Sequence, residues 1–291
     1  MASPKALLRT YGINPKKTLG QNFLCDRQAS EMIIRRCGIT AGDTVVEIGA
    51  GTGALTVPAA RAAIRVHAIE TDGRLIKLLE QMVNDNQLSN VAIHHKDIMD
   101  VDFPAMAGAA GGKLIVIGNL PYYLSSQILI RLVEHREVIS RAVLMFQQEL
   151  ARRVAAATGS REYGRLSVIM GYCSEVTTVA RLKPDLFYPR PGVHSEVIEI
   201  KFKNTPATGG CDEALLFDII RHAFGKRRKT LKNALTSGIP GPGIETWMDI
   251  LARAEIDPGA RAETLMASDF VNICNYYESI YATTKERHSN G

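Results

Sequence analysis

Residues 117–122 read Ile-Gly-Asn-Leu-Pro-Tyr and end an apolar run that is typical of a buried parallel strand. In open α/β sheets, ligands bind beyond the carboxyl ends of such strands, so Asn119 and Tyr122 are expected in a site. Pro121 restricts its own φ and the backbone of Leu120, which would hold the Leu120 carbonyl in one direction. An amide oxygen, a carbonyl and a flat ring could together hold an adenine and activate its amino nitrogen. The same residue types also occur in plain turns.

A second apolar run, residues 44–48, is also a strand candidate, and it leads directly into Gly-Ala-Gly-Thr-Gly at residues 49–53. Alternate glycines such as Gly49 and Gly51 let the backbone come close to a ligand. Their spacing is neither the G-x-G-x-x-G of dinucleotide sites nor a phosphate-binding P-loop, so a pyrophosphate is not the expected ligand.

Two further strand candidates end at carboxylates. Residues 65–69 lead to Glu70, which could accept hydrogen bonds from both hydroxyls of a ribose, and residues 91–94 lead to Asp97, which could accept one from the amino group of a bound adenine. Neither acid is specific alone, because strand-end acids are often merely solvated and NAD enzymes carry one at a similar distance. Four strand ends in chain order, each bringing polar groups to one sheet edge, favour a single nucleoside site.

The order of these motifs resembles that of the class I S-adenosylmethionine-dependent methyltransferases, and Asn-Leu-Pro-Tyr resembles the motif of their adenine-N6 branch. Further segments are similar to the KsgA-type ribosomal RNA adenine dimethyltransferases: the amino-terminal signature at residues 17–24, the cofactor loop at 46–56, an F-x-P-x-P-x-V-x-S segment at 187–195 and a basic helix at 223–231. These matches span nearly the whole chain and are more specific together than any one of them.

The resemblance implies a Rossmann-like class I methyltransferase sheet of the α/β class, a small C-terminal all-helical domain, and S-adenosyl-L-methionine as cofactor. The expected cofactor contacts are Gln21, Asn22, Leu24, Gly49, Gly51, Glu70, Asp97 and Asn119. The expected catalytic residues are Asn119, Leu120, Pro121, Tyr122 and Phe187. Tyr122 and Phe187 would sandwich a base that has left its stack, although Phe187 could instead be a plain core residue. Tyr123 and His194 depart from the residues common in the family at their positions, and Tyr123 could alter the fit of the base.

Composition agrees with this reading without being specific. A length of 291 residues suggests two domains, and 46% hydrophobic residues is enough for an ordinary core. We find no apolar run long enough to span a bilayer and no signal-peptide segment, so we expect a soluble, cytoplasmic protein. The five cysteines are scattered without C-x-x-C spacing, which argues for reduced thiols and against a bound metal.

The distribution of charge is more informative than the net charge of +5. No acid precedes Asp26, and residues 221–235 contain none either. Such basic segments can be solvated faces, but two of them flanking an adenine site favour contacts with RNA phosphates. The expected RNA-binding residues are Lys16, Lys17, Arg221, Lys226, Arg227, Arg228 and Lys229.

The domain boundary is expected at the turn-rich residues 204–211. Residues 1–204 would form the methyltransferase domain, with a basic arm at residues 1–20, and residues 205–291 a helical domain that binds RNA or the ribosome. Within this second domain, helices are expected at residues 213–224, 226–236 and 244–254.

The leading hypothesis is a dimethyltransferase that acts on two adjacent adenines near the 3′ end of 16S rRNA, in the small (30S) ribosomal subunit or its precursor, coupled to ribosome biogenesis. We expect a monomer without a membrane partner. One alternative resembles the erythromycin-resistance methyltransferases of large-subunit rRNA. Another is a small-subunit assembly factor whose methylation is incidental. DNA adenine methylation is the weakest candidate.

Overall fold

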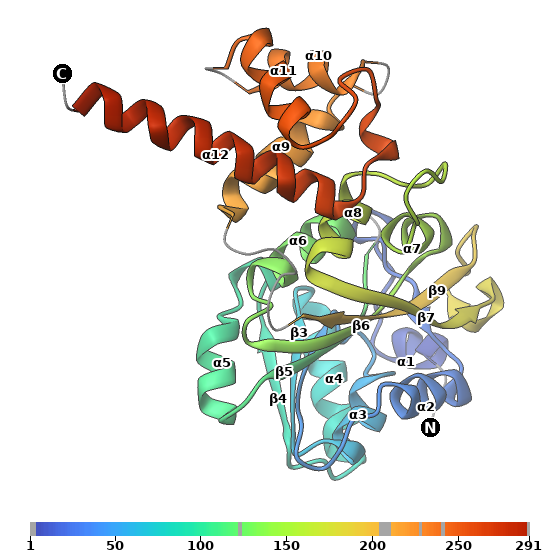
Figure 1. Cartoon of the computed structure of the whole chain (residues 1–291). Helices are drawn as coiled ribbons and strands as arrows, with labels where there is room; N and C mark the ends of the chain where they lie inside the picture. Colours follow the sequence, from blue (N-terminus) through green and yellow to red (C-terminus); the bar gives the residue numbers. More distant parts are fainter. Residues whose placement is uncertain (1–3, 122–123, 204–210, 227–228, 240–241, 290–291) are drawn as a thin grey trace. The chain divides into compact units, whose positions relative to one another are not determined.

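The strands form at continuous apolar runs, because a strand covered on both faces needs no polar alternation. The computed structural model describes residues 4–121, 124–203, 211–226, 229–239 and 242–289, with all side chains except those of Lys17 and of residues 281–289 (Figure 1). Within this part of the chain, a seven-stranded sheet has the order β4-β3-β2-β5-β6-β9-β7. Its strands are β2 (Thr44–Ile48), β3 (Arg65–Glu70), β4 (Val91–His95), β5 (Leu114–Asn119), β6 (Ile139–Gln147), β7 (Ser174–Leu182) and β9 (Ser195–Phe202).

Five neighbouring strands of the sheet are mutually parallel, namely β4, β3, β2, β5 and β6, and β9 is antiparallel to β6. The expected strands at residues 44–48, 65–69, 91–94, 114–117 and 197–202 are confirmed, with bounds that differ by at most two residues. Because β2 has β3 on one side and β5 on the other, the strand order reverses at β2, and this is where open α/β sheets bind ligands.

Helices cover the sheet by burying one face each. In α4 (Gly73–Asp85), buried apolar residues recur at the spacing of a helical face, and Asp72 caps the amino end. Further helices of the first unit are α2 (Arg27–Arg36), α3 (Thr56–Ala62), α5 (Phe103–Ala110) and α6 (Ser125–Glu134), with the 3-10 turn η2 (Ile98–Asp100). The helix α7 (Gln148–Val154) runs from the first compact unit of the chain into the second. The carboxyl ends of β2, β3 and β5 remain accessible and line a cavity.

The amino-terminal segment contributes α1 (Pro4–Thr10), the 3-10 turn η1 (Lys17–Leu19) and the short strand β1 (Phe23–Leu24). Strand β1 pairs antiparallel with β8 (Phe187–Tyr188), which follows the turn η3 (Pro184–Leu186). Two segments that the sequence analysis singled out separately are therefore neighbours.

The chain divides into two compact units, but not at one boundary. The first unit is residues 1–151 and 176–202, and the second is residues 152–175 and 203–291. One division, between residues 202 and 203, lies next to the domain boundary expected at residues 204–211. Residues 152–175, which were expected in the first domain, belong to the second unit. Tyr163 shows the reason: it is buried, its hydroxyl donates to the Leu265 carbonyl at 2.9 Å, and its ring lies against Phe224.

In the described part of the second unit, the regular secondary structure is helical except at the start of β7. Its helices are α8 (Arg165–Cys173), α9 (Glu213–Ala223), α10 (Leu231–Gly238), α11 (Ile244–Arg253) and α12 (Ala267–Ser289), with the turn η4 (Ala262–Thr264). The helix α10 begins at Leu231, so the expectation of a helix from residue 226 is wrong at Lys226, Lys229 and Thr230, while Arg227 and Arg228 lie outside the described residues. Leu231 is fully buried, while Lys226 and Lys229 are exposed, so the helix starts at the first residue with a core to pack into.

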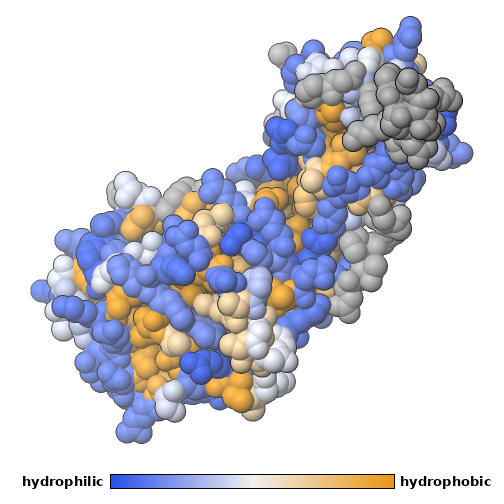
Figure 2. Space-filling model, turned by 90° about the vertical axis from the view of Figure 1, so that its left-hand side faces the viewer, coloured by the Kyte–Doolittle hydropathy of each residue, from blue (hydrophilic) through white to orange (hydrophobic). Residues whose placement is uncertain are grey.

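The face drawn in Figure 2 carries small groups of hydrophobic residues surrounded by hydrophilic ones. Large exposed hydrophobic side chains, such as Ile64, Met99 and Met266, come from different parts of the chain. Single residues of this kind are ordinary on a protein surface. Among the described residues, none of the helices is both long and apolar enough to cross a bilayer.

Candidate functional site

A cavity of about 270 Å³ opens at the carboxyl ends of β2, β3, β4 and β5. The expected site residues that line it are Gln21, Asn22, Gly49, Gly51, Glu70, Asp97, Asn119, Leu120 and Pro121. The four strand ends that the sequence analysis grouped therefore meet at one place, because parallel strands end at the same sheet edge. The expected contacts with a bound cofactor remain predictions.

The glycine loop after β2 comes very close to the amino-terminal segment. Gly51 has a φ of +57°, and a Cβ atom built on it would lie 3.2 Å from the Phe23 ring. The amides of Gly49 and Ala50 donate to the Ile69 carbonyl at 2.9 and 3.1 Å, which ties the loop to the end of β3. A side chain at position 51 would therefore strain the backbone and crowd the cavity wall.

Glu70 is buried, and backbone amides hold both of its carboxylate oxygens. Gly51 N donates to Oε2 and Asp72 N donates to Oε1, each at 2.8 Å. Burial raises the pKa of Glu70, and these amide hydrogen bonds oppose that shift. Each oxygen keeps a further lone pair, so the carboxylate can still accept hydrogen bonds from two ligand hydroxyls.

Asn119 ends β5 beside the glycine loop, since a Cβ atom built on Gly49 would lie 3.8 Å from the Asn119 carbonyl oxygen, and its side chain is fixed through the amide nitrogen. Its Nδ2 donates to the Asn22 carbonyl oxygen at 2.7 Å. The remaining polar atom of the side chain is Oδ1, which is an acceptor. Beyond it, the Pro121 carbonyl accepts hydrogen bonds from Ser125 Oγ and Leu124 N, which ties the motif to the start of α6. Tyr122 and Tyr123 lie outside the described residues.

Asp97 is exposed at the rim, and its Oδ1 accepts a hydrogen bond from Met99 N at 2.9 Å. Its neighbours Lys96 and Ile98 also line the cavity and were missed. Ile98 is buried beside the carboxylate and gives that end an apolar surface suited to a flat base. Their positions next to a strand-end acid were the available signal.

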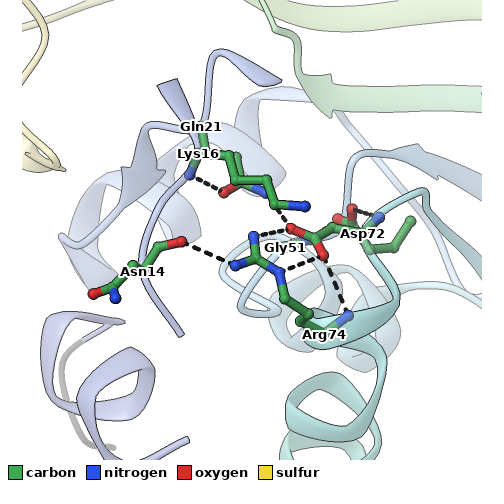
Figure 3. A network of polar contacts seen from close by, with 7 residues as sticks. Asn14, Lys16, Gln21, Gly51, Asp72 and Arg74 are labelled. Carbon is green, nitrogen blue, oxygen red and sulfur yellow. Dashed lines mark hydrogen bonds and ion pairs between the residues drawn. The ribbon is translucent and has the colours of Figure 1, made fainter. Parts of the chain in front are cut away.

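Gln21 lines the cavity, but the protein engages both ends of its side-chain amide (Figure 3). Its Oε1 accepts from Lys16 N at 2.8 Å, and its Nε2 donates to Asp72 Oδ2 at 2.9 Å. Asp72, which the sequence analysis did not select, is therefore part of the surroundings of the site. An Asp two residues after Glu70, at the start of a helical pattern, was the signal for it.

Leu24 and Phe187 are not among the residues that line this cavity. They face each other across the β1–β8 pair, and both are buried in the hydrophobic core. Leu24 instead lines a second cavity of about 220 Å³, together with residues of α1, α2 and α3. The structure therefore gives Phe187 the core role that the sequence left open, and stacking of its ring on a base stays a prediction.

The basic residues are described only in part. Lys16, Lys226 and Lys229 are exposed, Lys226 Nζ is 3.3 Å from Ser237 Oγ, and Arg221 forms an ion pair with Asp218 at 2.7 Å. Arg227, Arg228 and the side chain of Lys17 lie outside the description. RNA binding by the set remains a prediction.

Comparison with known proteins gives the same picture. Residues 12–279 match the family model described as ribosomal RNA adenine dimethylase. The chain is 45% identical over 283 residues to a ribosomal RNA small subunit methyltransferase A of Desulforapulum autotrophicum, covering 97% of this chain and 99% of that one. It is 41% identical to a protein of the same description from Pelotomaculum thermopropionicum, covering 95% and 97% of the two chains.

Solved structures agree. A dimethyladenosine transferase from Plasmodium falciparum is similar with a TM-score of 0.75 and 25% identity, over 88% of this chain and 98% of that one. The 23S rRNA methyltransferase ErmE shows the same fold, with a TM-score of 0.66 and 22% identity over 87% and 98% of the two chains. The class I methyltransferase architecture is therefore confirmed.

Proposed function

The chain belongs to the ribosomal RNA adenine dimethylase family, and on that premise we propose that it dimethylates N6 of two adjacent adenines near the 3′ end of 16S rRNA. The methyl donor would be S-adenosyl-L-methionine, and the substrate the small (30S) ribosomal subunit or its precursor. The position of Asn119 carries this proposal. The Asn22 carbonyl holds its amide nitrogen, so its side-chain oxygen is the atom offered to an amino group.

The cavity suits this cofactor by the chemistry of its walls. Glu70 would offer a carboxylate to ribose hydroxyls, Asp97 would offer one to the adenine amino group, and Ile98 adds an apolar surface to the lining. The backbone around Gly49 and Gly51 leaves room for the amino-acid part. When bound, S-adenosylmethionine supplies an electrophilic methyl group on a sulfonium.

The chain's own contribution is to activate a poor nucleophile. The lone pair of an adenine amino nitrogen is delocalised into the ring. If Asn119 Oδ1 and the Leu120 carbonyl both accept its hydrogens, the nitrogen moves toward a tetrahedral form and its lone pair turns to the methyl group. No strong base is needed, because the proton becomes acidic once the methyl group is attached. This is catalysis by positioning and by preorganised dipoles. The monomethylated nitrogen keeps one hydrogen, which permits a second transfer.

Binding of the rRNA would rest on the base and on the phosphates. The target adenine must leave its stack, and Tyr122 is placed in the sequence to cover it. The basic residues of the amino-terminal arm and of the second unit would contact phosphates. We expect the enzyme to work as a monomer in the cytoplasm, coupled to ribosome biogenesis.

The test is methylation of small subunits that lack the modification, followed by mass analysis of the nucleosides. Large-subunit RNA and DNA are run in parallel, and Asn119→Ala is the matched inactive control. We expect dimethyladenosine from the small subunit only. Methylation of large-subunit RNA would overturn the proposed substrate, and particle binding without methyl transfer by the wild-type protein would overturn the proposed activity.

A further inference from the structure

One wall of the cavity, residues 19–23, comes from the amino-terminal segment, far in sequence from the strands that form the rest. Side-chain hydrogen bonds tie this wall to the sheet at two points. Asn119 holds the Asn22 carbonyl oxygen, and Gln21 Nε2 donates to Asp72 Oδ2 at 2.9 Å. The first contact belongs to the catalytic motif. The second has no role in the mechanism above.

Gln21 closes its own segment into a compact turn. Its Oε1 accepts from Lys16 N at 2.8 Å, and the Lys16 carbonyl accepts hydrogen bonds from Leu19 N and Gln21 N at 3.1 and 3.4 Å. The polar atoms of the Gln21 side chain are therefore used to shape the wall and to anchor it. This arrangement favours a structural task for Gln21 over direct recognition of the cofactor.

Asp72 accepts the hydrogen bond from Gln21, and Arg74 fixes the Asp72 side chain in turn (Figure 3). Its side chain is 3% exposed, and Arg74 donates to both of its oxygens, through Nε at 2.9 Å and through Nη2 at 2.5 Å. A guanidinium that contacts both carboxylate oxygens fixes the orientation of the carboxylate. Hydrogen bonding from Arg74 keeps the pKa of Asp72 well below its usual range, so the carboxylate stays ionised.

The same two residues also reach the rest of the site. Asp72 N donates to Glu70 Oε1 at 2.8 Å, and Arg74 Nη1 donates to the Asn14 carbonyl at 3.2 Å. Asp72 therefore touches the expected ribose-binding carboxylate through its backbone and the opposite wall through its side chain.

We propose that Asp72 and Arg74 are positioning residues that hold the wall of residues 19–23, through Gln21, at the distance from Glu70 that S-adenosylmethionine requires. The proposal rests on the proposed function for the identity of the cofactor. Neither residue needs to touch the reacting atoms. Loss of the anchor should weaken cofactor binding and leave the chemical step nearly unchanged.

Asp72→Asn tests this, because the amide keeps the size of the side chain but cannot serve both Arg74 and Gln21. We expect KM for S-adenosylmethionine to rise about tenfold, the effect of losing one hydrogen bond to a charged group, with kcat within about twofold. The calorimetric Kd of S-adenosylhomocysteine should rise by a similar factor. Amide hydrogen exchange in residues 16–24 should become faster in the protein without ligand.

Asp102→Asn is the matched control. Asp102 caps α5 by accepting from Ala105 N at 2.9 Å, as Asp72 caps α4, but among the described contacts its carboxylate has no hydrogen bond to residues 19–23. It should lose comparable helix stability with no change in KM. Gln21→Glu places a second carboxylate against Asp72 and should also raise KM. In the double variant Gln21→Glu with Asp72→Asn, the amide at position 72 can donate to the carboxylate at position 21, so the contact between the two side chains is restored with its direction reversed. The KM of the double variant should therefore fall about tenfold below that of Gln21→Glu alone.

An unchanged cofactor Kd in Asp72→Asn would overturn the proposal, as would a raised Kd without faster exchange in residues 16–24, since the effect would then act through Glu70 alone. Additive effects in the double variant would also overturn it. If the wild-type protein bound the cofactor but methylated no small subunits, the proposed function would fail while the Kd and exchange comparisons would still decide the role of Asp72.

Discussion

Asn119 and Asn22 are 97 positions apart in the sequence, yet the Asn119 side-chain amide donates to the Asn22 carbonyl oxygen at 2.7 Å. This bond fixes which end of the Asn119 amide faces the cavity. It also joins the motif expected to bind the target base to the segment expected to bind the cofactor. The Asn119 side chain thus fixes the position of one expected binding segment relative to the other.

We expect Asn119→Ala to lower the rate of methyl transfer by roughly 10²-fold or more, as when one preorganised polar contact is lost, and to weaken cofactor binding less. Asn119→Asp should also slow methyl transfer, because it places a carboxylate oxygen against the Asn22 carbonyl oxygen. Single-turnover kinetics measure the rate, and thermal unfolding verifies the fold. Near-normal turnover in either variant would remove Asn119 from the mechanism.

Phe187→Ala should destabilise the first unit by about 3–5 kcal/mol, because the ring is buried against Leu24 and the core. If the ring also stacks on the target adenine, binding of RNA should lose about 1–3 kcal/mol more. Chemical denaturation gives the first quantity, and KM for small subunits gives the second, while kcat is corrected for the folded fraction. Wild-type activity per folded molecule would make Phe187 a core residue only.

Replacing Lys226, Arg227, Arg228 and Lys229 with Gln should weaken RNA binding and flatten its dependence on salt. Each lost phosphate contact on single-stranded RNA reduces the slope of log K against log salt by about 0.7. Arg253→Gln is the control, because Arg253 is exposed in the same unit but is paired with Asp249 at 3.0 Å. An unchanged slope in the quadruple variant would make these residues an ordinary solvated surface.

Gly118→Ala should destabilise the sheet by about 1–3 kcal/mol or more, because a Cβ there would lie 2.7 Å from the Ile48 carbonyl oxygen. Gly118 is where β5 pairs with the end of β2, so the crowding would reach the site. Gly108→Ala is the control in α5, where a Cβ meets nothing within 4 Å, and it should stabilise by about 1 kcal/mol. Equal effects of the two changes on urea denaturation would contradict this account.

Burial raises the pKa of Glu47 from its ordinary 4.5 to about 8, although Thr56 Oγ1 donates to its carboxylate at 2.5 Å. The stabilising contribution of this group is therefore fully present below pH 4.5 and is lost as the pH rises toward 8. The slope is at most about 1.4 kcal/mol per pH unit. Glu47→Gln should make stability fall less between pH 5 and pH 8, whereas Glu31→Gln, at a partly exposed position on α2, should leave this pH dependence unchanged. Parallel stability curves for wild type and Glu47→Gln would show that Glu47 is not the titrating group.

Local patterns predicted what depends on local chemistry. The strands that end at Glu70 and Asn119 were found because apolar runs mark burial, and the strand ends converge because parallel strands share an edge. Contacts between distant segments could not be predicted from local patterns. The partner of Gln21 depends on where β1 lies in the fold, and the assignment of residues 152–175 to the second unit depends on the packing of Tyr163. The start of α10 was misjudged because charged residues carry no signal of where burial begins.

Strand β1 is only two residues long, and its residues serve different tasks: Phe23 lines the cavity beside Gly51, and Leu24 fills the core opposite Phe187. Because side chains alternate along a strand, a shift by one position would exchange these tasks, turning Leu24 toward the cavity and Phe23 toward the core cluster that holds Phe187. Insertions and deletions should therefore be absent between residue 20 and Asp26 in functional members of the family, even where the arm before them varies in length.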